Sequence, residues 1–173
     1  EVAPFAKTGG LADVLLGLGR WLGQKGPKGP GHDVRLFLPF YQRIQKSDLK
    51  TTPLPGAQAI DVRFPNRTIR FSIKTAPLPQ SEVPVYFVDC NELYDRDGIY
   101  TEDGDEALRF GFLSRAVLET CQRLQWAPDV IHCNDWHTGL LPLYLRTTYA
   151  WDKLFAPTKT LLSIHNIGYQ GFF

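Results

Sequence analysis

The sequence predicts an α/β domain, a Rossmann-like parallel sheet with helices on both faces. Two observations predict this class. Short apolar runs typical of strands alternate along the chain with amphipathic helical patterns. Three of the expected strands are also followed at once by polar, glycine- or histidine-bearing segments, and parallel α/β sheets bind ligands at the carboxyl ends of their strands. With 173 residues, the chain is long enough for one domain with a substantial core.

Three helices are expected. Residues 10–24 and 106–125 place apolar side chains at three- and four-residue spacing, the period of an amphipathic helix. In the second helix the expected buried stripe is Phe110, Leu113, Val117, Cys121 and Leu124. The charged side chains expected elsewhere on that helix are Arg109, Arg115, Glu119 and Arg123. A shorter helix is expected over 138–147, with Thr138 as its cap and Pro142 near its first turn.

The strands are expected in short apolar or alternating runs. Those that read as buried strands are 34–38, 83–88, 129–133 and 160–164. The alternation of 59–64 and 68–75 around a Pro-Asn-Arg turn predicts a hairpin. The regions expected at the surface are the glycine- and proline-rich residues 25–31, the proline-broken residues 40–58, and the acidic loop 89–104.

Composition excludes several classes of protein. A formal net charge of +1 gives no basic footprint for nucleic acid, so no nucleic-acid partner is expected. No apolar run reaches membrane-spanning length, and no membrane partner or secretion leader is expected. Cys90, Cys121 and Cys133 show no paired spacing, which favours reduced thiols in a cytoplasm-like compartment. The chain has no methionine and both ends look cut, so we expect a fragment of a longer protein.

The first polar segment, Lys-Thr-Gly-Gly at residues 7–10, opens the first helix. Gly9 and Gly10 let the backbone approach a ligand, the helix start presents amide hydrogens and a positive dipole end, and Lys7 adds a charge. These features predict an anion or phosphate site. The alternative is a tight strand-to-helix turn with a solvated lysine. Neither the dinucleotide-binding nor the Walker glycine pattern is present.

The second segment, residues 132–137, reads His-Cys-Asn-Asp-Trp-His. One interpretation is a metal site made by His132, Asp135 and His137, joined by His165. Another is a packed strand end with Trp136 in the core. A third is a sugar site, in which Asp135 accepts hydroxyl hydrogen bonds and Trp136 offers an apolar wall.

The third segment, residues 165–171, combines an imidazole, amides and glycines after the last expected strand. Such groups suit hydrogen bonding to hydroxyls and the stabilisation of charge that develops during a reaction. The alternative is a plain turn, with Asn166 and Gly168 in left-handed conformations.

Together these segments resemble a known family, the bacterial glycogen synthases and plant starch synthases that use ADP-glucose. Residues 1–14 resemble its amino-terminal Lys-Thr-Gly-Gly signature, and 31–35 with 38–39 resemble its second strand. Residues 128–140 resemble its His-Asp-Trp segment and 163–171 its His-Asn-Tyr-Gln-Gly segment. The matches run in order from end to end of the chain.

The resemblance implies the GT-B architecture, two Rossmann-like domains that face each other across a cleft. Residues 1–173 would be part of the amino-terminal domain, and the carboxyl-terminal nucleotide-binding domain would be absent. The implied reaction transfers glucose from ADP-glucose, with retention, to the non-reducing end of an α-1,4-glucan. No metal or cofactor is implied, and this piece alone is expected to be inactive. The implied partners are the nucleotide sugar and the glucan, the location is the bacterial cytoplasm or alternatively the plastid stroma, and the oligomeric state stays open.

The resemblance also implies roles for single residues. His165 and Asp135 are the expected catalytic residues, with His165 at the reacting glucose. The residues expected to bind the donor are Lys7, Gly9, Gly10 and Asn166. Asp13 is expected near the glucan or the donor, and its alternative role is compensation of the helix dipole.

The chain departs from the family pattern at three places. Residues 24–30 lengthen a loop, Asp105-Glu106 replaces an aspartate–asparagine pair, and Cys133-Asn134 stands where the family commonly has alanine or histidine followed by histidine. Two other functions remain as alternatives, a metal-dependent hydrolase and a non-catalytic glucan-binding module. The choice of ADP-glucose over UDP-glucose rests on the resemblance alone.

Overall fold

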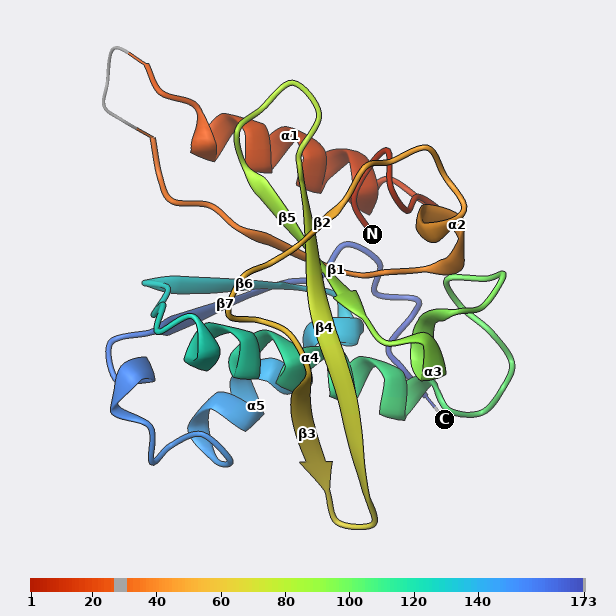
Figure 1. Ribbon diagram of the computed structural model, residues 1–173, viewed down its shortest axis with the longest axis vertical. Coiled ribbons are helices and arrows are strands. Elements are labelled where there is room, and N and C mark those ends of the chain that lie inside the picture. The colour runs from red at the N-terminus through yellow and green to blue at the C-terminus, as the bar shows by residue number, and fades with distance from the viewer. Residues whose placement is uncertain (27–30, 173) are drawn as a thin grey trace. The chain divides into compact units, whose positions relative to one another are not determined.

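The computed structural model describes residues 1–26 and 31–172. The described chain forms two compact units (Figure 1). Unit 1 consists of residues 1–58 and 72–99, and unit 2 of residues 59–71 and the chain from 100 onward. The loop expected over 25–31 falls mainly on residues 27–30, which lie outside the described residues.

In unit 1, helix α1 (Leu11–Gly23) packs on a mixed sheet. The sheet has the order β1 (Leu36–Pro39), β5 (Pro84–Asp89), β4 (Arg67–Pro77) and β2 (Thr52–Pro53). β1 and β5 are parallel, whereas β4 pairs antiparallel with both β5 and β2. Gly19 of α1 lies so close to the sheet that an added Cβ would come 3.1 Å from Leu36 Cδ1. Two short helices, α2 (Gln42–Gln45) and α3 (Asn91–Tyr94), follow the ends of β1 and β5.

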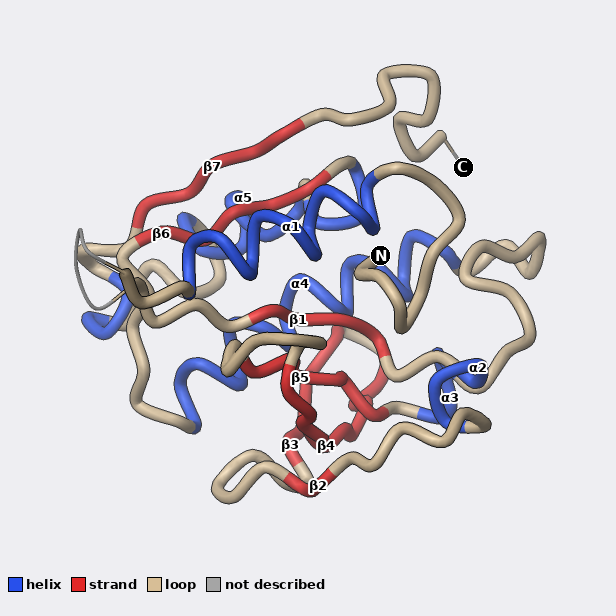
Figure 2. Tube along the Cα trace, turned by 90° about the horizontal axis from the view of Figure 1, so that it is seen from above, coloured by secondary structure: helices blue, strands red, loops and turns tan. Residues whose placement is uncertain are grey.

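In unit 2, helix α4 (Glu106–Arg123) contacts the hairpin strand β3 (Ile60–Phe64) and helix α5 (Leu140–Arg146). β3 pairs antiparallel with residues 67–71 of β4. Strands β6 (Val130–Asn134) and β7 (Lys159–Ser163) run parallel, side by side (Figure 2). The 3₁₀ helices η1 (Trp136–Thr138) and η2 (Lys153–Phe155) lie between them in sequence. Apolar side chains of β3, β4 and α4 form the core of this unit, including Ile60, Val62, Phe71 and Phe112.

The α/β class with parallel strands is confirmed. The two long helices and all strands except β2, which was not predicted, start and end within a few residues of the predicted positions. Parallel pairing occurs in both units, β1 with β5 and β6 with β7. No helix of the described chain combines the length and apolarity needed to cross a bilayer. The assignment of residues 1–173 to one partial Rossmann-like domain stays a prediction.

Three local predictions are wrong. The segment 40–58, expected at the surface, buries Phe40, Tyr41 and Ile44. Phe40 packs against Phe87 of β5, and Tyr41 packs against Tyr94 of α3. The loop expected over 89–104 contains α3. Thr138 does not cap the helix that follows, since Gly139 holds that position and Thr138 bonds back to β6.

The charged side chains of α4 were expected outside its buried stripe, but Arg109 is completely buried. Its Nη1 atom lies 3.6 Å from Glu106 Oε1 and 3.4 Å from Thr101 Oγ1, and its guanidinium lies 5.5 Å from the Phe110 ring centre. The helical period alone cannot predict this burial, because α4 is covered by neighbours on several sides and not only along one stripe.

Candidate functional site

In unit 1, the side-chain carboxylate of Glu1 binds the backbone amides that precede α1. Glu1 Oε2 accepts hydrogen bonds from the backbone amides of Thr8 (2.9 Å) and Gly9 (3.1 Å), and Glu1 Oε1 accepts one from the Thr8 hydroxyl. A short bridge between Val2 and Ala6 brings Glu1 back to this loop. The donors of this loop thus bind an intramolecular anion, the Glu1 carboxylate, and a phosphate site here stays a prediction.

Lys7 and Asp13 form an ion pair beside the same loop. Lys7 Nζ lies 2.7 Å from Asp13 Oδ2 and 2.9 Å from Oδ1, with both side chains about half exposed. Exposed pairs of this kind contribute roughly 0–1 kcal/mol, so the pair holds Lys7 only weakly. Asp13 lies in the first turn of α1, so it is also placed to compensate the helix dipole.

The two glycines of this loop are required neither by backbone geometry nor by packing. Gly10 has an ordinary helical φ of −67°, and a Cβ built on Gly9 or Gly10 would meet no heavy atom within 4 Å. The space beside both glycines is therefore open, although the Gly9 amide itself is bonded to Glu1.

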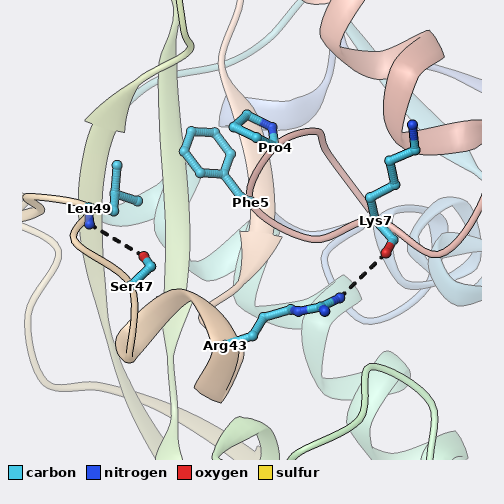
Figure 3. Close-up of a pocket in the computed structure, with 6 residues that line it drawn as sticks. All are labelled: Pro4, Phe5, Lys7, Arg43, Ser47 and Leu49. Carbon is cyan, nitrogen blue, oxygen red and sulfur yellow. Dashed lines mark hydrogen bonds between the residues drawn. The ribbon is translucent and has the colours of Figure 1, made fainter.

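A pocket of about 480 Å³ adjoins this loop in unit 1 (Figure 3). Its lining residues are Pro4, Phe5, Lys7, Arg43, Ser47 and Leu49. Arg43 Nη1 donates a long hydrogen bond of 3.4 Å to the Lys7 carbonyl, while the Lys7 ammonium points away from Arg43 (Figure 3). The pocket thus combines an apolar wall of Pro4, Phe5 and Leu49 with a guanidinium.

In unit 2, the buried carboxylate of Asp135 ties the end of β6 to the segment after β7. Asp135 Oδ1 accepts hydrogen bonds from the backbone amides of His165 (2.7 Å) and Asn166 (3.2 Å). Asp135 is only 7% exposed and has a φ of 56° with a ψ of −178°, a conformation that non-glycine residues rarely adopt. Asp135, His165 and Asn166 are therefore brought together, as the sequence predicts.

Two histidines make side-chain hydrogen bonds between the ends of β6 and β7. His165 Nε2 lies 2.9 Å from Asn134 Oδ1, and His132 Nε2 lies 2.7 Å from Ser163 Oγ. Burial, followed by the charge of nearby His165, lowers the pKa of His132 below its usual 6.5. Burial raises the pKa of the Cys133 thiol, which follows His132 in β6, from 9.0 to about 11.

The segment after His165 is a turn, but Asn166 and Gly168 do not take the left-handed conformations that the alternative prediction gave them. Asn166 Oδ1 accepts the Gly168 amide at 3.1 Å, and the Tyr169 amide bonds to the Asn166 carbonyl at 3.2 Å. Gly171 has the positive φ in this segment, +71°, and neither Asn166 nor Gly168 does. The positive φ lets Gly171 lie against the Trp136 indole, where an added Cβ would come 2.7 Å from Cε3.

Trp136 and this turn line a pocket of about 470 Å³ in unit 2. Its lining residues are Thr101, Glu102, Gly104, Glu106, Trp136, and residues 168–172. The indole packs edge-on against Phe110, with ring centres 5.0 Å apart, and lies 4.1 Å from the His137 ring centre. The lining thus combines an aromatic side chain with two carboxylates, which are groups suited to binding the apolar face and the hydroxyls of a sugar.

The family model for the starch synthase catalytic domain matches residues 1–173. The chain belongs to this family.

Curated relatives of this family match the whole chain. It is 46% identical to a glycogen synthase of Desulforudis audaxviator and 42% identical to one of Photobacterium profundum. The alignments cover 100% of this chain but only 34% and 33% of those relatives, so the chain spans about a third of their length. Among solved structures, the catalytic domain of starch synthase IV from Arabidopsis thaliana, bound to ADP and acarbose, matches with a TM-score of 0.84 and 31% identity. That match covers 98% of this chain and 33% of the other.

The metal interpretation finds no support in the geometry. Within the described parts of the chain, no three His, Cys, Asp or Glu side chains converge so that they could hold a metal ion. His132 instead bonds Ser163, and His137 packs in the aromatic cluster with Trp136 and Phe110. The four side chains of that interpretation are thus engaged elsewhere.

Sequence reasoning missed several residues of these sites. Glu1, Arg43 and Asn134 reach their hydrogen-bond partners across turns or between strands. Glu102 and Glu106 line the pocket of unit 2. A signal existed for Glu106 and Asn134, since both are positions where the chain departs from its family pattern. Nothing in the local spacing points to Glu1 or Arg43.

Proposed function

We propose that this chain is part of a glucosyltransferase that moves glucose from ADP-glucose to the non-reducing end of an α-1,4-glucan with retention of configuration. The observation that carries the proposal is the match to the starch synthase catalytic domain over all 173 residues. The glycogen synthases among its relatives and the ADP and acarbose bound to the Arabidopsis neighbour support the donor and the acceptor class.

In this proposal, residues 1–173 form part of the amino-terminal Rossmann-like domain of a GT-B enzyme. The carboxyl-terminal nucleotide-binding half would come from the rest of the polypeptide, which agrees with relatives about three times as long. The piece alone would then be inactive. The bacterial origin of these relatives favours the cytoplasm as its location.

The loop before α1 would receive the donor diphosphate. The amides of Thr8 and Gly9 already bond a carboxylate, which supports their suitability for phosphate oxygens. Lys7 would exchange its weak contact with Asp13 for a phosphate, and the open surroundings of Gly9 and Gly10 would admit the donor. Asp13 would return to compensating the dipole of α1.

His165 would lie at the reacting glucose and stabilise the charge that develops as the bond to the diphosphate breaks. Asp135 would serve this step by fixing the His165 and Asn166 backbone, to which it is bonded. Because the oxygen of the Asn166 side chain is taken by Gly168, its NH₂ group would be the one offered to a sugar hydroxyl. No metal or cofactor has a role in this scheme.

The pocket beside Trp136 would hold part of the glucan. The exposed Tyr169 offers an aromatic face for the apolar face of a glucose ring, Trp136 forms part of the apolar wall, and Glu102 and Glu106 offer hydroxyl acceptors.

The test is an assay of the complete open reading frame with radiolabelled ADP-glucose or UDP-glucose and glycogen, with and without a chelator. We expect incorporation from ADP-glucose that survives the chelator and falls at least tenfold in Lys7→Ala. Incorporation only from UDP-glucose would overturn the donor assignment, and none from either would overturn the proposed function. Activity of purified residues 1–173 alone would contradict the need for a second domain.

A further inference from the structure

The side chain of Asn134 fixes which nitrogen of His165 carries the proton. Asn134 Nδ2 donates a hydrogen bond of 3.2 Å to the His132 carbonyl, so the amide NH₂ must face that carbonyl. The remaining oxygen, Oδ1, then faces His165 Nε2 at 2.9 Å. An amide oxygen only accepts, so Nε2 must donate, and the neutral ring carries its hydrogen on Nε2.

Asn134 is itself held firmly at the end of β6. Its backbone amide donates to Thr138 Oγ1 at 2.7 Å, and the same hydroxyl donates to the Asn134 carbonyl at 3.0 Å. The β6–β7 register also places Asn134 opposite Ser163, two residues before His165. His165 lies on the exposed segment after β7, where no strand pairing restrains it.

The imidazole is therefore fixed from two sides. Asp135 holds the backbone of His165 through its amide, and Asn134 holds the far end of the ring through Nε2. With Nε2 engaged, Nδ1 is the ring nitrogen left to accept a hydrogen bond from a ligand, or to donate one when the ring is protonated. A partner on one ring nitrogen commonly sets the tautomer and orientation of a functional histidine.

We propose that Asn134 is a positioning residue for glucosyl transfer, which holds His165 in the Nε2–H form and presents Nδ1 to the reacting sugar. This inference rests on the proposed function, because it acts through His165. It adds a residue that the sequence reasoning set aside, at a position where this chain departs from the usual pattern of its family.

The kinetic test uses the complete enzyme with Asn134→Leu, a substitution of similar size that removes the acceptor. Misplacement of a reacting group by about 1 Å can cost on the order of 100-fold in rate, so we expect kcat to fall about 10- to 100-fold. KM for ADP-glucose should stay within about twofold, because Asn134 is not expected to touch the donor. Asn134→Asp retains an acceptor and should lose less, and Asn66→Leu, in the exposed hairpin turn, is the matched control.

A double-mutant cycle separates positioning from a general structural effect. In a His165→Ala background, Asn134→Leu should cause no further loss of kcat, because the ring on which it acts is gone. A full further loss in that background, or a kcat equal to wild type in Asn134→Leu alone, would overturn the inference while leaving the proposed function intact.

An NMR measurement on the wild-type enzyme decides the tautomer without any variant. Long-range ¹H–¹⁵N correlation should show the proton of neutral His165 on Nε2. A proton on Nδ1 would overturn the inference even if every variant failed to fold. Absence of glucosyl transfer by the wild type would instead remove the proposed function, and the positioning role would fall with it.

Discussion

Asp135 gives the sharpest quantitative prediction, because one buried oxygen accepts two backbone amides. Hydrogen bonds to an ionised group contribute about 1.5–3 kcal/mol each. The lower limit for the amides of His165 and Asn166 gives roughly 3 kcal/mol for the pair. Loss of this amount would raise the equilibrium constant for local opening of the segment by roughly 100-fold, since about 1.4 kcal/mol corresponds to tenfold.

Amide hydrogen exchange in Asp135→Ala measures this opening directly. We expect the His165 and Asn166 amides to lose about 100-fold in protection, while the paired amides inside β6 and β7 change much less. Asp135→Gly should also lose both bonds, but it relieves the strain at a φ of 56°, so its global stability should exceed that of Asp135→Ala.

Asp129→Ala is the matched control, because Asp129 is an exposed acidic residue just before β6. It should leave the protection of His165 and Asn166 unchanged. Unchanged protection in Asp135→Ala as well would refute the reasoning, because the carboxylate would then not hold the segment.

Three further outcomes are expected. Gly9→Ala and Gly10→Ala should leave the thermal unfolding midpoint within a few degrees of wild type yet weaken ADP-glucose binding by the complete enzyme, measured by calorimetry; an unfolded variant would contradict the open surroundings of these glycines. Cys133 should resist alkylation in the native protein at pH 8, because its pKa of about 11 keeps it a thiol. Since the unperturbed pKa is 9.0, the contribution of Cys133 to stability should be complete below pH 9 and be lost between about pH 9 and 11, which urea unfolding at different pH values would reveal. NMR of the His132 C2 proton should give a pKa below 6.5, and this pKa should move back toward 6.5 in His165→Ala. Because the pKa is lower in the folded protein, the contribution of His132 to stability is present above about pH 6.5 and is lost as the pH falls toward the folded pKa.

The helices and strands that were predicted well are those in which apolar residues recur at a regular spacing. The leucine spacing of α1 and the alternation of β3 and β4 depend on neighbours in the chain, so local pattern was sufficient. The proximity of Asp135, His165 and Asn166 was also predictable, because parallel strands bring their carboxyl ends to one edge.

The residues that sequence reasoning missed depend on pairing between distant segments. Asn134 meets His165 only because β6 and β7 pair in one register, and a shift of one residue would turn it to the other face. The burial of Arg109 depends on how many neighbours surround α4, and a helical period does not contain this information.

The carboxylate of Glu1 on the Thr8 and Gly9 amides acts as a tethered competitor for any anion that approaches them. A group on a short tether is present at an effective concentration on the order of millimolar. Chloride or a dissolved carboxylate carries one charge and must compete with Glu1 at this effective concentration without a second contact to the protein. A diphosphate offers several oxygens and can engage Lys7 at the same time, so it can displace Glu1 where a simple anion cannot. If the loop binds the donor as proposed, it would discriminate by the charge of the ligand before any part of a sugar or base is recognised.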